Sequence, residues 1–309
     1  MQVEQTIKPM IFIEKGKYFQ NWDDNQYCIG DKDNCKAFLS AKKVLWKANP
    51  KLNDYEDVFY LRLKPSKADR NDEFPSYVVK LPNLKQLDIP ISFLEKINED
   101  SLPECLETLI ITANDSYIST KSNYPSFPSV GLEKIKGLVL DTPTWLNLNF
   151  SDISISQNNF PNLKYLNTGI DKEGLILQNI KDLQNLDFIE IHNLGSHQIF
   201  DYLPSRLKKM YLSEMKKDFS LEGIVSYNDI EFLSIAHSQA EIDCELLSKL
   251  PNLKELYVRS SKKMKNIELL LECKELRSLT IIDCSNPFKK VKRELFEEKF
   301  TYLLNIDFA

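Results

Sequence analysis

The chain has 309 residues, of which 42% are hydrophobic and 28% are charged. These values are ordinary for a soluble globular protein. They exclude a disordered tail, a collagen-like fibre and a membrane protein as descriptions of the whole chain. The 40 basic and 45 acidic residues leave a net charge of −5. Because so weak a negative balance does not attract a polyanion, nucleic acid is not an expected partner.

The first residues do not fit a secretory signal. Glu4, Lys8 and Glu14 leave an apolar run of only Met10 to Ile13, whereas a signal peptide needs an apolar run of roughly 7–15 residues after a basic start. No segment approaches the roughly 18–20 apolar residues of a membrane span. We therefore expect a cytoplasmic protein that does not interact with a membrane.

Residues 1–55 carry none of the periodicity found later in the chain, although they hold two of the three tryptophans. Apolar residues on both sides of Lys15–Gly16 predict short strands around a turn. We expect these residues to form a small subdomain of their own.

From residue 56 onward, apolar residues recur in the form L-x-x-L-x-L, as in Leu253, Leu256 and Val258. Successive copies begin 21 to 29 residues apart, and three consecutive steps are 23 residues long. The first anchors of the copies are Val58, Leu84, Leu106, Ile135, Leu163, Leu186, Leu207, Ile230, Leu253, Leu276 and Leu303. Flanking residues recur too, as LPNLKQL at 81–87, FPNLKYL at 160–166 and LPNLKEL at 250–256. A period of this length indicates a solenoid of stacked repeats.

This pattern resembles the leucine-rich repeat proteins over residues 56–309. The resemblance implies an α/β fold, a solenoid of about ten to eleven repeats with a curved parallel β-sheet on its concave side. Helices and irregular loops would lie on the convex side, and residues 1–55 would cap the first repeat. The asparagine that the family carries three residues after the third anchor is degenerate here, being Asn114, Ser238, Ser261 or Cys284 in different repeats. We therefore expect the turn after each strand to vary.

The anchors should point inward from short strands, because one repeat cannot bury them without its neighbours. Helical spacing of apolar residues predicts that the chain returns as helices over 196–203, 243–250 and 266–273. Prolines and polar residues predict irregular loops over 112–131 and 141–160. A further helix is expected from Pro287 through Phe300.

Six cysteines are present: Cys28, Cys35, Cys105, Cys244, Cys273 and Cys284. Cys105, Cys273 and Cys284 lie in apolar periodic segments, where a free thiol behaves as a small hydrophobic side chain. We expect free thiols, as is usual in the cytosol. Cys28 and Cys35 are the one pair close enough in sequence to bridge a small loop.

The motifs of common catalytic and metal sites are missing from the sequence. His192, His197 and His237 have no acidic or cysteine residue at metal-ligand spacing, and GxSxG, HExxH and GxxxxGK[ST] do not occur. We therefore predict a protein that is not an enzyme and that binds no metal or cofactor.

The resemblance implies that a protein partner binds on the concave sheet. Residues that alternate with the anchors should point outward there, and five consecutive repeats place an aromatic side chain among them, with charged residues around it. The predicted partner-binding residues are Tyr165, Phe188, Glu190, His192, Lys209, Tyr211, Phe232, Glu255, Tyr257 and Arg259. Exposed aromatics within a charged rim are typical of protein-binding hot spots. The alternative is that strands favour aromatics, which then pack against their neighbours.

The sequence therefore favours a non-enzymatic protein–protein interaction module. A cytoplasmic adaptor or a bacterial toxin-immunity protein is one specific form of it. The alternative function is a substrate-recognition subunit of an enzyme complex such as a ubiquitin-ligase-type assembly. We expect a monomer, or a dimer formed through the open edge of the last strand.

Overall fold

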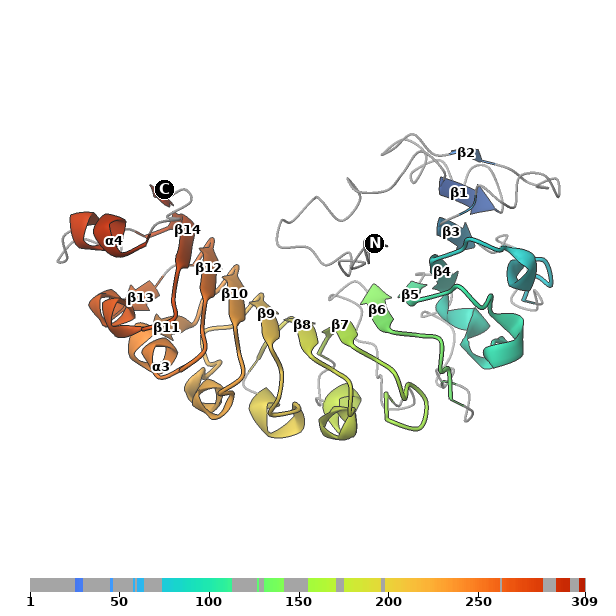
Figure 1. Cartoon of the computed structure of the whole chain (residues 1–309), viewed down its shortest axis with the longest axis horizontal. Helices are drawn as coiled ribbons and strands as arrows, with labels where there is room; N and C mark the ends of the chain where they lie inside the picture. The colour runs from blue at the N-terminus through green and yellow to red at the C-terminus, as the bar shows by residue number, and fades with distance from the viewer. Residues whose placement is uncertain are drawn as a thin grey trace, which may run out of the picture. The chain divides into compact units, whose positions relative to one another are not determined.

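The computed structural model is shown in Figure 1. It describes residues 26–29, 45–46, 58, 60–63, 74–112, 127, 131–141, 155–170, 175–195, 198–261, 263–285, 293–300 and 306–308. The chain divides into two compact units. The N-terminal unit comprises Met1–Pro143 and Asn158–Tyr165, and the C-terminal unit comprises Thr144–Gln157 and Leu166–Ala309.

The N-terminal unit is built on a parallel sheet in which each repeat contributes one strand. Its strands are β1 (Gln26–Ile29), β2 (Leu45–Trp46), β3 (Tyr60–Leu63), β4 (Gln86–Pro90), β5 (Thr108–Thr112) and β6 (Gly137–Asp141), in the spatial order β2-β1-β3-β4-β5-β6. The second anchors of successive repeats lie opposite one another, Leu61 beside Leu87, Leu87 beside Leu109, and Leu109 beside Leu138. All four are fully buried. The repeat register therefore sets the pairing of the strands.

The C-terminal unit repeats the same arrangement. Its strands are β8 (Phe188–His192), β9 (Lys209–Ser213), β10 (Phe232–Ala236), β12 (Glu255–Arg259), β14 (Ser278–Cys284) and β15 (Ile306–Phe308), parallel and in that order, and β7 (Tyr165–Gly169) begins at the last residue of the N-terminal unit. Figure 1 shows these strands side by side, with the returning turns on the other side of the unit. Ile189, Met210, Leu233, Leu256 and Leu279 follow one another across the sheet, each at most 1% exposed. The predicted leucine-rich repeat solenoid is confirmed.

A recurring pair of hydrogen bonds starts strands β5, β6, β7, β9, β10, β12 and β14. The N–H groups of Lys254 and Glu255 both donate to the carbonyl of Glu231, at 2.8 and 3.0 Å. One repeat earlier, the N–H groups of Glu231 and Phe232 donate in the same way to the carbonyl of Lys208. Each of these repeats is thereby held to the one before it through its backbone, whatever its side chains are.

The turn after the strand is shared by five successive repeats of the C-terminal unit, whereas Ile91 and Ile170, at the same position of earlier repeats, do not adopt it, so the turn varies along the chain as expected. These five repeats place a residue with φ between 49° and 60° seven residues after the first anchor: Asn193, Glu214, His237, Ser260 and Asp283. The N–H groups of Glu214, His237 and Ser260 donate to carbonyls of the following repeat. Left-handed backbone is tolerated best by asparagine, aspartate and histidine among residues with a side chain. In these five repeats the turn thus keeps one backbone shape while its side chains vary.

The returning segments are mostly short 3₁₀ turns. They are η3 (Val78–Lys80), η4 (Ile91–Lys96), η5 (Glu99–Ser101), η7 (Leu175–Leu177), η8 (Ile180–Asp182), η9 (Ile199–Tyr202), η10 (Glu222–Ser226) and η11 (Ile267–Glu272). An α-helix forms at α3 (Cys244–Ser248), where the Asp243 side chain accepts from the N–H of Glu245 at 3.0 Å. Over 196–203 and 266–273 the prediction of helices was wrong in type, because apolar residues three apart suit a 3₁₀ turn as well as an α-helix.

Other predictions lie partly outside the described residues. A short helix, α4 (Arg293–Lys299), occurs within the predicted 287–300 segment. A two-stranded parallel sheet of β11 (Glu241–Asp243) and β13 (Lys263–Lys265) joins two returns of the C-terminal unit. Most of 1–55, with Lys15–Gly16 and Cys35, lies outside what the structure describes, as do most of the predicted loops at 112–131 and 141–160, so the cap remains a prediction.

The recurring asparagine of the PNL flank has a structural role. Asn252 donates through Nδ2 to the carbonyl of Asn228 in the preceding repeat, and Asn162 donates likewise to Glu133, both at 2.9 Å. Arg206, at the same position of its own repeat, donates to the carbonyl of an earlier return at 2.7 Å. The residue before the first anchor thus forms a hydrogen bond to the returning segment of an earlier repeat.

Tyr227 forms a second kind of hydrogen bond between the returning segments of neighbouring repeats. Its ring is 1% exposed, and its hydroxyl donates to the carbonyls of Phe200 at 2.5 Å and Leu203 at 3.3 Å. We predict that Tyr227→Phe lowers the free energy of unfolding by about 1–2 kcal/mol, because it removes the donor and leaves two carbonyls underused. Urea denaturation followed by circular dichroism measures this change.

Tyr202→Phe is the matched control, since Tyr202 lies in the preceding return with its side chain exposed. It should change the stability by less than about 0.5 kcal/mol. Equal stability of the Tyr227→Phe variant and the parent protein would contradict the role of this hydroxyl.

The described cysteines support a second prediction. Cys105, Cys244, Cys273 and Cys284 are free thiols, as expected, and all but Cys105 are buried. Burial raises the pKa of each thiol, most strongly that of Cys244. Because a raised pKa leaves less reactive thiolate at neutral pH, iodoacetamide should leave Cys244, Cys273 and Cys284 unmodified in the native protein and modify them in urea. Peptide mass spectrometry checks this, and rapid native labelling of Cys244 would contradict it.

Candidate functional site

The outward face of the C-terminal sheet carries three columns of side chains, which the register of its strands defines. Column one runs Phe188, Lys209, Phe232, Glu255 and Ser278; column two runs Glu190, Tyr211, Ser234, Tyr257 and Thr280; column three runs His192, Ser213, Ala236, Arg259 and Ile282. Nine of the ten predicted partner-binding residues therefore share one face, which we call the sheet face. The tenth, Tyr165, belongs to the N-terminal unit.

The aromatic side chains of this set are less accessible than the sequence suggested. Phe188, Tyr211 and Phe232 are each 7% exposed, Tyr165 is 4% exposed, and only Tyr257 is half-buried. The expectation of exposed aromatics was wrong for four of the five. The physical reason within the C-terminal unit is lateral packing: Phe188, Tyr211 and Phe232 alternate between columns one and two, and side chains on adjacent strands cover one another.

The accessible groups of the sheet face are charged and polar. Lys209 and Glu255 are exposed and stand on either side of Phe232 in column one. His192 and Arg259 are half-buried at separate positions of column three. The centre of column one is therefore the Phe232 ring, with the cation of Lys209 on one side and the anion of Glu255 on the other.

His192 is the hub of a polar network that no single repeat could build. Its Nδ1 lies 2.5 Å from Ser213 Oγ, and its Nε2 lies 3.1 Å from Glu190 Oε1 and 3.1 Å from Asn167 Oδ1. Its ring also tilts against Tyr211, with centroids 5.9 Å apart. Three successive strands, β7, β8 and β9, are linked through this one imidazole.

Histidine between a serine and a carboxylate has the ingredients of nucleophilic catalysis. Here Ser213 is only 3% exposed, and Glu190 and Asn167 are each 7% exposed. A substrate carbonyl could not reach the serine hydroxyl without displacing the side chains that cover it. The network is therefore suited to fixing the positions of the side chains on the sheet face.

Tyr211 experiences this environment directly. Burial raises the pKa of its phenol well above the ordinary range, and the nearby Glu190 carboxylate raises it further. The positive charge of Arg259 acts in the opposite direction on the same phenol. Tyr211 therefore stays neutral at physiological pH and keeps its hydroxyl hydrogen.

The N-terminal unit has a buried polar cluster on the outward side of its own sheet. The Asp88 carboxylate is 4% exposed; it accepts a hydrogen bond from Tyr60 at 3.0 Å and one from Thr112 at 2.6 Å. It also pairs with Arg62, whose Nε lies 2.9 Å from its Oδ2. A buried carboxylate here has its lone pairs occupied by partners on both neighbouring strands.

The predicted set omitted Ser213 and Asn167, two of the residues that fix His192. The sequence did contain a signal for Ser213, because it lies six residues after the anchor Leu207, as His192 does after Leu186. Asn167 also lies on the outward side of its strand by alternation. Their pairing with His192 had no such signal.

The described residues offer neither a metal-binding cluster nor a membrane-spanning helix. Among them, no group of three or more histidine, cysteine, aspartate or glutamate side chains is placed to hold a metal ion. Within the same residues, helices are all too short or too polar to span a bilayer. His197 lies outside the described part of the chain.

Comparison with known proteins gives similarity at the level of structure. No family model matches the chain, and no curated protein matches it. The chain is similar to the internalin InlF of Listeria monocytogenes, with 12% identity over 79% of this chain and 60% of that one and a TM-score of 0.32. It thus spans less than two thirds of the InlF chain.

Two further solved structures are similar. A leucine-rich repeat protein of Leptospira interrogans has 14% identity over 91% of this chain and 89% of its own, with a TM-score of 0.32. Internalin C2 of Listeria monocytogenes has 14% identity over 80% and 84%, with a TM-score of 0.27. At such low identities, nothing about a partner or an activity follows from these proteins.

The His192 network makes a testable contribution to stability. We predict that His192→Ala lowers the free energy of unfolding by about 1–3 kcal/mol, because Ser213 and Asn167 then lose the ring nitrogens that they contact while remaining buried. Thermal or urea denaturation at neutral pH measures it. Lys209→Ala is the control on the same face; its side chain is exposed, so its effect should stay within about 0.5 kcal/mol. Equal effects of the two substitutions would contradict the network.

Proposed function

We propose that this chain is a non-enzymatic module that binds a protein partner on the sheet face of its C-terminal unit. The observation that supports this most is the centre of column one, where Phe232 lies between exposed Lys209 and exposed Glu255 in strict register. Leucine-rich repeat solenoids typically serve protein–protein interaction, and that link is one of fold alone.

The composition of the sheet face fits an interface. Interface cores are enriched in tyrosine, phenylalanine and arginine, with a polar rim around them. Tyr257 and Arg259 are half-buried beside this centre and offer area and charge together. The buried aromatics support the exposed groups from below and keep them in place.

Preorganisation strengthens the case for binding. The His192 network and the strand register hold the face in one arrangement before a partner arrives. Association therefore loses less side-chain and backbone freedom than it would on a loop. A rigid sheet with charged groups of both signs selects a partner by charge pattern as well as by shape.

The finer assignment rests on the sequence. A cytoplasmic adaptor, or a neutraliser such as a toxin-immunity protein, is consistent with a repeat pattern that extends over residues 56–309. Either would use the sheet face in the same way.

Site-specific photo-crosslinking tests the proposal. A benzophenone amino acid is placed at Lys209 or at Glu255 in the full-length protein, and irradiation is carried out in the native cell. Both positions should give the same discrete crosslinked species, because both flank Phe232. Gel shift and mass spectrometry identify it.

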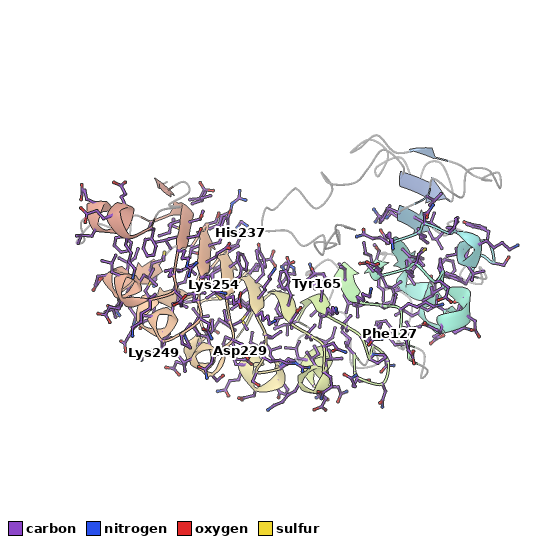
Figure 2. The ribbon with its side chains drawn as sticks, in the orientation of Figure 1. Phe127, Tyr165, Asp229, His237, Lys249 and Lys254 are labelled. Atoms are coloured by element: carbon purple, nitrogen blue, oxygen red, sulfur yellow. The ribbon has the colours of Figure 1, made fainter. Side chains whose placement is uncertain are left out.

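Lys249 is the matched control position. Its side chain is 53% exposed. Figure 2 shows Lys249 on the side of the C-terminal unit that carries the turns, away from the strands. It should give no such species. Crosslinks of equal yield from Lys249, or none from Lys209 and Glu255, would refute binding on the sheet face.

A further inference from the structure

Arg259 is a cation of the sheet face whose Nε–H has no hydrogen-bond acceptor among the described residues. A guanidinium carries five N–H donors, and in the described part of the chain its Nε is buried without an acceptor. The carboxylate beside it belongs to Asp283, with 3.8 Å between Nε and Oδ2. That separation is too long for a hydrogen bond.

The same chain shows what a satisfied arginine looks like on its sheet. In the N-terminal unit, Arg62 lies opposite Asp88 in register, and the two approach to 2.9 Å in a buried setting. In the C-terminal unit, the register neighbours of Arg259 are Ala236 and Ile282, neither of which carries charge. The Arg259 guanidinium therefore has no carboxylate opposite it in register, whereas the Arg62 guanidinium has one.

Asp283 does not fill this role. Its side chain is 51% exposed and that of Arg259 is 33% exposed. An ion pair at such a distance and exposure is weak, because water competes for both charges. A carboxylate that arrives with better geometry can displace it.

The other groups around Arg259 also favour an acceptor. Tyr211 lies near enough for the Arg259 charge to lower the pKa of its phenol against the effect of burial, and its hydroxyl makes no hydrogen bond within the described residues. Ala236, which lies in register between Arg259 and Ser213, is small. Of the competing acids, Glu190 lies 3.1 Å from His192 and is nearly buried, and Glu214 is exposed beyond the end of its strand.

We propose that Arg259, assisted by the Tyr211 hydroxyl, receives the carboxylate of an aspartate or glutamate side chain of the protein partner. This inference rests on the proposed function and names the chemistry of one contact within it. The planar guanidinium matches a carboxylate with two parallel hydrogen bonds, which a lysine could not provide. The partner would therefore present an acidic side chain over column three.

Carboxylate binding by Arg259 can be tested without knowing the partner. The chain has six arginines, so arginine-selective ¹⁵N labelling gives few Nε signals. The probe is glutamate blocked at its amino and α-carboxyl groups, whose side-chain carboxylate is its only charge. It should shift the Arg259 Nε–H signal saturably, and blocked glutamine at equal ionic strength should not.

Three variants sharpen the result. Arg259→Gln should abolish saturable binding, and Asp283→Asn should tighten it about two- to fivefold by removing the competing carboxylate. Arg277→Gln is the control, because Arg277 is exposed and lies 3.4 Å from Glu275; binding should be unchanged. Equal shifts with blocked glutamine, no shift with blocked glutamate, or weaker binding in Asp283→Asn would overturn the inference.

The outcome is separable from that of the proposed function. If Lys209 and Glu255 give crosslinks while Arg259 does not bind blocked glutamate, the sheet face binds a partner by other contacts. The proposed carboxylate site at Arg259 is then refuted. If Arg259 binds blocked glutamate while those crosslinks are not formed, partner binding on the sheet face is refuted. The carboxylate site at Arg259 is then still supported.

Discussion

Burial of the anchor positions of the described repeats, each against its counterpart in the next repeat, is the constraint on which the rest of the structure depends. Leu233, Leu256 and Leu279 illustrate it, since they stack across three strands and are at most 1% exposed. Each such side chain contributes roughly 1.5–3 kcal/mol when it leaves water. A slip of one residue would turn a whole row of anchors to solvent, so the register is fixed strongly.

A fixed register also determines the opposite side of the sheet. It brings His192, Ser213 and Asn167 together although they are more than 20 residues apart in sequence, and it sets Phe232 between Lys209 and Glu255. The face thus combines a rigid, largely covered floor with a few accessible charges. This division suits recognition, because the accessible groups are oriented before a partner arrives.

Much of this could be predicted from the spacing of apolar residues. The strands fall where L-x-x-L-x-L places them, since the pattern reports burial on one side of an extended chain. The 3₁₀ returns and the common left-handed turn at Asn193, Glu214 and His237 were not predicted. Apolar spacing does not distinguish i+3 from i+4 hydrogen bonding, and a backbone shape shared by such different residues leaves no pattern in their identities.

The order of residues alone thus established the repeat, the inward anchors and the set of positions that face outward, because each depends on periodicity within one short segment. The tertiary structure decided which side chains on the outward face are accessible to solvent and which of them form hydrogen bonds or ion pairs. Phe232 is covered while Lys209 is exposed, and Arg62 pairs with a buried carboxylate at 2.9 Å while Arg259 has only the half-exposed Asp283 at 3.8 Å. Such differences depend on the size and charge of neighbours one repeat away, which only the stacking of strands brings into contact.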